Sequence, residues 1–182
     1  LLGDGLLSLA QKTGSKSLTG TSVFDPVLTE ILVNWFCPPH GRIIDPFAGG
    51  SVRGMVSSFL GADYTGIDLR QEQIDANIAE YDKNSTLEDI DGSPIRMPNW
   101  ICGDGLDCKR LAPGEYDFFF TCPPYADLEV YSKDERDLST MEYGKFREVY
   151  TDIIREATSM LKEDRFAAIV VGEVRNKKGM YY

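Results

Sequence analysis

The sequence has few of the residues that build common metal and disulfide sites. It contains one histidine, and its four cysteines form no CxxC pair (Cys37, Cys102, Cys108 and Cys122). This inventory does not supply a usual zinc ligand set, and it argues against a metal site. His40 stands between a proline pair and Gly41, a setting typical of a surface turn and not of a catalytic base. The cysteine usage indicates a reducing, intracellular setting.

Long apolar runs are also missing. No stretch approaches the length of a membrane span, and the N-terminus has no signal-peptide pattern. A chain of 182 residues with 42% hydrophobic and 26% charged residues is typical of one soluble globular domain with a real core. Residues 1–20 are rich in Gly, Ser, Thr and Leu without periodicity, so we expect an N-terminal arm followed by a single domain over residues 21–182.

Basic residues are too few to balance the acidic ones. Lys and Arg number 19 against 29 Asp and Glu, which gives a net charge of −10. Phosphate contacts depend on Lys and Arg, so this charge argues against tight, autonomous binding to nucleic acid. Basic residues do gather near both ends of the chain (Lys12, Lys16, Arg165, Arg175, Lys177 and Lys178). That distribution is compatible with a local basic face on an acidic body.

The most informative stretch runs from Arg42 to Arg53. A short apolar strand ends at Asp45, turns at Pro46, and passes through a glycine pair into a helix that reaches about residue 60. Glycine allows positive φ and removes the Cβ that would hold a ligand away, so this turn predicts a ligand cradle. Asp68 lies nineteen residues after Gly49, at the end of a second short strand. That spacing suits a carboxylate that binds ribose hydroxyls.

Strand and helix patterns alternate along the chain. We expect strands over 42–45, 64–67, 99–102, from 115 to 120, and over 166–171, with a turn at 162–164; helices are expected over 26–36, 54–60, 71–81 and 143–161. Such alternation predicts an α/β fold, with a doubly wound, mostly parallel sheet and helices on both faces. Asp25 is placed to cap the first helix, whose shared apolar face is Val27, Ile31, Leu32 and Trp35.

A second motif follows the fourth strand, which runs directly into Thr121-Cys122-Pro123-Pro124-Tyr125. With the DPFAGG turn upstream, the chain resembles the S-adenosylmethionine-dependent amino-methyltransferases, chiefly the DNA adenine-N6 and cytosine-N4 enzymes of phages and restriction-modification systems. The resemblance covers about residues 21–172. The order of the motifs favours adenine, although a serine-like residue before Pro-Pro is typical of cytosine-N4 enzymes.

The resemblance implies a Rossmann-like class I methyltransferase that uses S-adenosylmethionine. Its substrate would be double-stranded DNA with the target base flipped out, in the cytoplasm of a bacterial or phage-infected cell, with no membrane association. The fold normally has two further strands, so we expect the catalytic domain over residues 21–182 to be incomplete at its C-terminal end, with a partner subunit or a homodimer as options.

The resemblance also assigns roles to residues of the Pro-Pro-Tyr turn. Cys122 and the backbone carbonyl of Pro123 would accept hydrogen bonds from the target amine, Pro124 would shape the turn, and Tyr125 would stack on the base. Cys122 departs from the usual Asp, Asn or Ser. A thiol is a weak acceptor, so the departure implies lower activity, a different substrate amine, or help from Thr121.

For the cofactor, the resemblance places Phe24 and Asp25 over the methionine end and gives Asp68 and Leu69 the ribose. It puts the DPFAGG turn beneath the cofactor (Asp45, Pro46, Phe47, Ala48, Gly49 and Gly50), and it places Asp104 at the adenine amino group. From local sequence alone, a helix cap and staple explain Phe24 and Asp25 equally well, and a plain Asp-Gly turn explains Asp104.

Other functions stay open at this point. An RNA methyltransferase acting on guanine N2 or adenine N6 has a similar pair of motifs, and a cofactor-binding subunit without catalysis would fit Cys122 and the acidic charge. Protein glutamine methylation uses an Asn before Pro-Pro, which this chain lacks. A nicotinamide enzyme is disfavoured because the first turn lacks the GxGxxG spacing.

Overall fold

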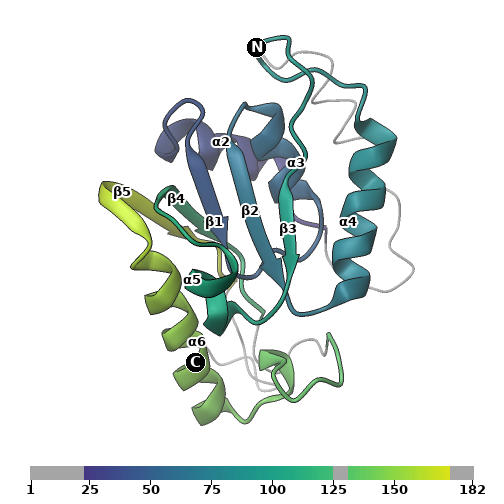
Figure 1. Cartoon of the computed structure of the whole chain (residues 1–182). Coiled ribbons are helices and arrows are strands. Elements are labelled where there is room, and N and C mark those ends of the chain that lie inside the picture. Colours follow the sequence, from purple (N-terminus) through teal and green to yellow (C-terminus); the bar gives the residue numbers. More distant parts are fainter. Residues whose placement is uncertain (1–22, 125–130, 173–182) are drawn as a thin grey trace.

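The computed structural model describes residues 23–124 and 131–172 (Figure 1). Its helices are α2 (Pro26–Phe36), α3 (Val52–Phe59), α4 (Gln71–Asn84), α5 (Cys108–Leu111) and α6 (Tyr143–Thr158), with short 3-10 turns η1 (Gly105–Asp107) and η2 (Leu138–Thr140). Its strands are β1 (Arg42–Asp45), β2 (Asp63–Asp68), β3 (Asn99–Cys102), β4 (Tyr116–Thr121) and β5 (Leu161–Ile169). The predicted alternation of strands and helices is confirmed.

The five strands form one parallel sheet in the order β3-β2-β1-β4-β5. The chain therefore winds outward from β1 to β3 and then returns to place β4 on the other side of β1. This reversal is the topological switch point of a doubly wound sheet, where the turns after neighbouring strands diverge and leave room for a ligand.

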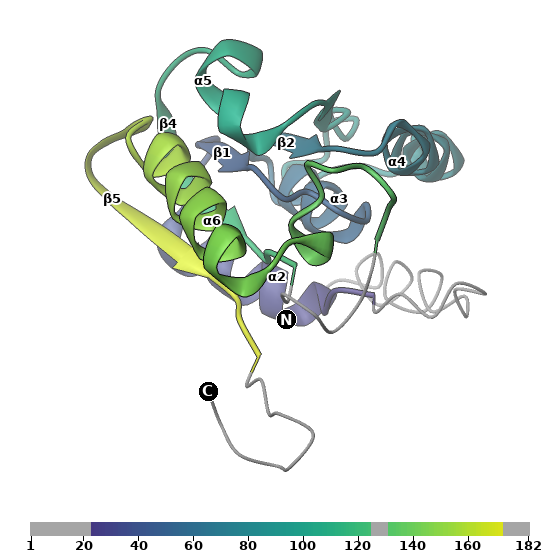
Figure 2. The same ribbon diagram turned by 90° about the horizontal axis from the view of Figure 1, so that it is seen from below.

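Alternate side chains of the central strands fill two cores. Ile43, Phe118 and Phe120 pack with α2, α3 and α4 on one face, while Ile44 and Phe119 pack with α5 and α6 on the other. Figure 2 shows α2 and α5 on opposite sides of the sheet. All six residues of β4 are buried, as expected for a parallel strand covered on both faces. Helices on both faces of a parallel sheet confirm the predicted fold class.

Helix α2 has the predicted bounds, but of its predicted core face only Leu32 packs against the core. Val27, Ile31 and Trp35 are 49%, 38% and 73% exposed, and the helix instead buries Thr29 and Val33. Thr29 is tolerated in the core because its hydroxyl donates to the backbone carbonyl of Asp25, at 3.1 Å. The prediction chose the face with the larger apolar side chains, Val27, Ile31 and Trp35. The face that is covered is instead the one that contacts the sheet.

The end of the sheet also differs from expectation, because β5 begins at Leu161 and includes the predicted turn at 162–164. Its pairing with β4 shifts from Tyr116↔Leu161 to Phe118↔Phe166, so the extra residues form a bulge, in which Asp164 has a φ of 54°. The bulge has an electrostatic role. Asp117 of β4 is 6% exposed, and its Oδ1 accepts from Lys162 Nζ at 2.8 Å and from Arg165 Nε at 3.2 Å.

Several sequence predictions lie outside the described residues, namely the arm over residues 1–20, Tyr125, and the basic residues of 173–182. Within residues 23–124 and 131–172, no helix is long and apolar enough to cross a bilayer.

Candidate active site

A cleft of about 890 Å³ opens at the carboxyl end of the sheet, where the turns after β1 and β4 diverge. Its lining comes from α2 and the residues before it, from the turns after β1 to β4, from α4 and from the 131–138 segment. The predicted site residues among this lining are Phe24, Asp25, Pro46, Phe47, Gly49, Gly50, Asp68, Leu69, Asp104, Cys122, Pro123 and Pro124. Most of the site that was predicted from the sequence is thus gathered in one cleft.

The turn after β1 is fixed by hydrogen bonds at Gly49. Its N–H donates to Asp68 Oδ2 at 3.0 Å, and its carbonyl accepts from Asn77 Nδ2 at 2.8 Å. Gly49 has a φ of 52°, a backbone conformation that favours glycine. At Gly50 an added Cβ would meet no protein atom within 4 Å, so glycine at that position leaves room toward the cleft without satisfying a backbone requirement.

Asp68 ends β2 and faces the turn that the sequence spacing predicted. Its Oδ1 accepts from the backbone N–H of Arg70 at 2.9 Å, while its Oδ2 accepts from Gly49. Each carboxylate oxygen can accept more than one hydrogen bond, so capacity remains for hydroxyl donors in the cleft. Burial raises the pKa of Asp68 above its usual 3.8, against the lowering effect of Arg70 and Gly49.

Asp25 and Asp104 each cap a helix and also line the cleft. Asp25 Oδ1 caps α2 by accepting from Val27 N at 2.8 Å, and Asp104 Oδ1 caps η1 by accepting from Leu106 N at 2.9 Å. Both aspartates also line the cleft. Each cap engages Oδ1, so capping and ligand contact are compatible at these positions.

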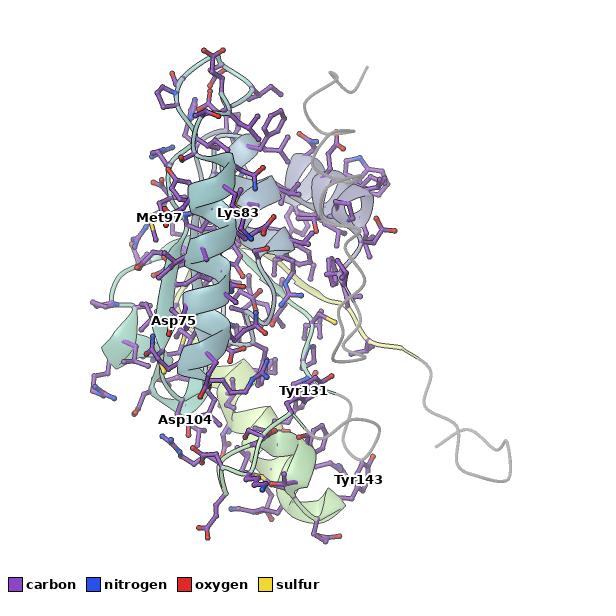
Figure 3. All side chains as sticks on the ribbon, turned by 90° about the vertical axis from the view of Figure 1, so that its right-hand side faces the viewer. Asp75, Lys83, Met97, Asp104, Tyr131 and Tyr143 are labelled. Carbon is purple, nitrogen blue, oxygen red and sulfur yellow. The ribbon has the colours of Figure 1, made fainter. Side chains whose placement is uncertain are left out.

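Four residues of the segment after the Pro-Pro turn also line the cleft (Tyr131, Arg136, Asp137 and Leu138), and sequence reasoning did not assign this segment residue by residue. Tyr131 and Asp104 lie toward the same end of the molecule (Figure 3). Asp137 in this segment is 7% exposed; its Oδ1 accepts from Ser139 Oγ at 2.6 Å, and its Oδ2 has no hydrogen-bond partner. A buried carboxylate oxygen without a donor is unusual, and it suits a site that receives a donor from a bound molecule or water.

The turn after β4 enters the same cleft through Cys122, Pro123 and Pro124. Thr121, the last residue of β4, is fully buried, and its hydroxyl donates to Asp45 Oδ1 at 2.6 Å. Thr121 is fully buried and does not line the cleft, so its hydroxyl is not placed to accept a hydrogen bond there alongside Cys122.

Asp45 and Ala48 do not line the cleft, although both were predicted to bind the cofactor. Both are fully buried, and the Asp45 carboxylate is surrounded by donors of the protein itself. Arg53 is the main residue that sequence reasoning missed. Its side chain is 5% exposed, and its Nε donates to Asp45 Oδ2 at 2.7 Å. An arginine eight residues after an aspartate across a glycine turn is the signal that could have indicated this pair.

Comparisons with known proteins bear on the fold. No protein-family model matches the sequence, and no curated protein matches it either. Among solved structures, TrmN from Thermus thermophilus has a TM-score of 0.60 at 17% identity and covers 80% of this chain and 38% of its own. A Streptococcus mutans protein assigned to the methyltransferases, solved in complex with SAH, has a TM-score of 0.56 at 11% identity and covers 81% and 73%.

An rRNA methylase from Streptococcus thermophilus has a TM-score of 0.55 at 7% identity and covers 82% of this chain and 72% of its own. These likenesses show that the chain shares its fold, a parallel sheet flanked by helices, with these proteins. The chain spans well under half the length of TrmN.

Proposed function

We propose that the chain is an S-adenosylmethionine-dependent methyltransferase acting on an exocyclic amine of a DNA base, with adenine N6 favoured over cytosine N4. The observation that carries this proposal is that the turn containing Cys122 and Pro123 enters the same cleft as Gly49 and Asp68. Acceptors for a base amine and acceptors for a ribose thus share one space.

The lining of the cleft fits the proposed cofactor. Its volume lies within the range of small-molecule sites, and its lining contains six acidic and three basic side chains (Asp25, Asp68, Glu72, Glu80, Asp104 and Asp137; Arg53, Arg70 and Arg136). A cationic sulfonium and ammonium are favoured by such a charge balance. Asp68 would hold the ribose, the free oxygens of Asp104 and Asp137 suit amine donors, and Phe24 would cover the methionine end.

S-adenosylmethionine, when bound, supplies an electrophilic methyl group. The chain must then orient an amine whose lone pair is delocalised into the base ring. Hydrogen bonds from that amine to the Pro123 carbonyl and to Cys122 would return electron density to nitrogen and fix its direction. No base with a raised pKa is required, since the amine loses its proton after methylation.

RNA is the second candidate acceptor. The same fold is present in the rRNA methylase of Streptococcus thermophilus, although fold alone does not determine the substrate. The test is transfer of labelled methyl groups from S-adenosylmethionine to mixed DNA and RNA, followed by nucleoside analysis. We expect N6-methyladenine in DNA. Label only in RNA would replace the DNA proposal, and cofactor binding without any transfer would favour a non-catalytic subunit.

Cofactor affinity should depend on pH through Asp68. An ionised carboxylate accepts hydroxyl hydrogen bonds that a protonated one cannot accept equally well, and burial raises the pKa of this group. Affinity is therefore expected to be constant near neutral pH and to fall on acidification, beginning above the pH at which an ordinary aspartate titrates. Calorimetric titration across this range tests the prediction. Asp68→Asn, which cannot ionise, should bind weakly with a flat profile; the same slope in this variant would contradict the assignment.

Replacing Tyr125 with alanine should spare the cofactor and slow transfer. Stacking of a base on an aromatic ring contributes about 1–3 kcal/mol, so kcat/KM should fall by about 5- to 150-fold. Tyr125→Phe keeps the ring and serves as the matched control. Single-turnover rates and cofactor titrations of both variants would show the difference. Turnover at the wild-type rate in Tyr125→Ala would contradict the assignment of Tyr125 as the residue that stacks on the base.

A further inference from the structure

The Asp45 carboxylate is the centre of a buried hydrogen-bond network beneath the cleft. Its Oδ1 accepts from the Phe47 backbone N–H at 3.0 Å and from Thr121 Oγ1 at 2.6 Å. Its Oδ2 accepts from Arg53 Nε and from Tyr64 Oη, both at 2.7 Å. Asp45 is fully buried, and these donors come from four different parts of the chain. The carboxylate is thus saturated from within the fold.

Arg53 extends this network to the turn after β1. Its Nη2 donates to the carbonyls of Phe47 and Ala48, at 2.6 and 3.0 Å, and its guanidinium lies over the ring of Phe24 at 4.8 Å from the centroid. Burial disfavours the guanidinium charge, but Asp45 outweighs this and raises the pKa of Arg53 above its usual value. The cofactor side of the cleft is therefore fixed to Asp45 through the buried guanidinium of Arg53.

Thr121 connects the same carboxylate to the acceptor side. The backbone pairing of β1 with β4 extends over Ile43↔Phe118 and Ile44↔Phe119. Beyond that pairing, toward the cleft, the bond from Thr121 to Asp45 joins the two strands, and Cys122 follows directly. The separation of the two turns is thus set at this point by a side-chain hydrogen bond.

We propose that Thr121 is a positioning residue, which holds the Cys122-Pro123 turn at the correct distance from the cofactor turn through Asp45. The inference rests on the proposed function, because in-line methyl transfer requires the amine and the methyl carbon to be aligned. A displacement of about 1 Å can lower such a rate by about 100-fold. Thr121 acts through Asp45 and does not touch either reactant.

The test compares three variants of the full chain. Thr121→Val removes the hydroxyl at nearly constant shape, Thr121→Ser restores it, and Tyr64→Phe removes a different donor from the same carboxylate without affecting the turn after β4. We expect Thr121→Val to lower kcat by about 10-fold or more while the dissociation constant for S-adenosylmethionine changes by less than about twofold. Thr121→Ser and Tyr64→Phe should retain kcat. An equal loss of kcat in Tyr64→Phe would show that the effect comes from a general loss of stability, and it would overturn the proposal.

A second measurement keeps this inference separate from the proposed function. The alkylation rate of Cys122 by iodoacetamide, resolved by peptide mass spectrometry, reports the placement of the turn without any substrate. We expect it to change at least about threefold in Thr121→Val and to stay constant in Tyr64→Phe, with the exposed Cys102 as the internal reference in each sample. An unchanged Cys122 rate would overturn the positioning role. If wild-type protein transferred no methyl group to nucleic acid, the proposed function would fail, and the Cys122 rate would still decide the position of the turn.

Discussion

Asp68→Ala is expected to lower the affinity for S-adenosylmethionine by about 100-fold or more. A hydrogen bond to a charged group contributes about 1.5–3 kcal/mol, and a ribose offers two hydroxyls to this carboxylate. The substitution also removes the acceptor for the N–H of Gly49. That hydrogen bond, 3.0 Å from Gly49 N to Asp68 Oδ2, holds the turn after β1 in place. A loss of about 3 kcal/mol or more follows, which corresponds to about two orders of magnitude in the dissociation constant.

Isothermal titration with S-adenosylmethionine and with S-adenosylhomocysteine measures this loss directly. Asp63→Ala is the matched control, because Asp63 begins the same strand at the opposite end of the sheet and its half-exposed side chain pairs with Arg96. Its affinity should equal that of the wild type. An Asp68→Ala variant that binds within about threefold of the wild type would contradict the ribose assignment.

Arg53→Met is expected to destabilise the fold by about 3–5 kcal/mol. The substitution leaves the fully buried carboxylate of Asp45 without its counter-ion, and removing one partner of a buried pair costs about this much. Burial raises the pKa of Tyr64 well above its usual value, as does Asp45, so the phenol stays neutral and donates a hydrogen bond without supplying charge. Urea unfolding followed by circular dichroism would measure the change in the free energy of unfolding.

The control for this prediction is an exposed ion pair of similar geometry. Arg155 Nη1 lies 2.6 Å from Asp152 Oδ1, but the two side chains are 70% and 58% exposed. Arg155→Met should therefore change the free energy of unfolding by less than about 1 kcal/mol. A similar loss in both variants would show that burial does not decide the contribution of Arg53.

The sequence predicted the architecture well because local signals and the expected fold agree. Asp25 and Pro26 mark the start of α2. Gly49 and Asp68, whose spacing of nineteen residues predicted a shared site, are joined by a direct hydrogen bond. The core face of α2 was mistaken because Thr29 is buried with its hydroxyl satisfied inside the helix, which a count of apolar residues does not detect.

The buried network at Asp45 was beyond local prediction. Arg53 lies within the same motif, but Thr121 is 76 residues from Asp45, and a hydroxyl at the end of an apolar strand gives no sign of its partner. Asp137 was missed for a similar reason, since its place in the cleft lining depends on the path of a segment without clear periodicity. The role of a side chain that acts through a partner distant in sequence can be identified only once the fold is known.

The switch point between β1 and β4 has a consequence for folding kinetics. β1 pairs with β2 through a short crossover, as in Ile44↔Thr65, whereas β4 reaches β1 only after the chain has passed through β2 and β3. Closure of the longer loop has the greater entropic cost, so docking of β4 is the slower event. Until β4 docks, the carboxylate of Asp45 lacks the hydrogen bond from Thr121, and we expect water to take that place. Its desolvation and the joining of the two sides of the cleft belong to the same step, so ligand-binding competence should appear during refolding together with the final burial of the sheet.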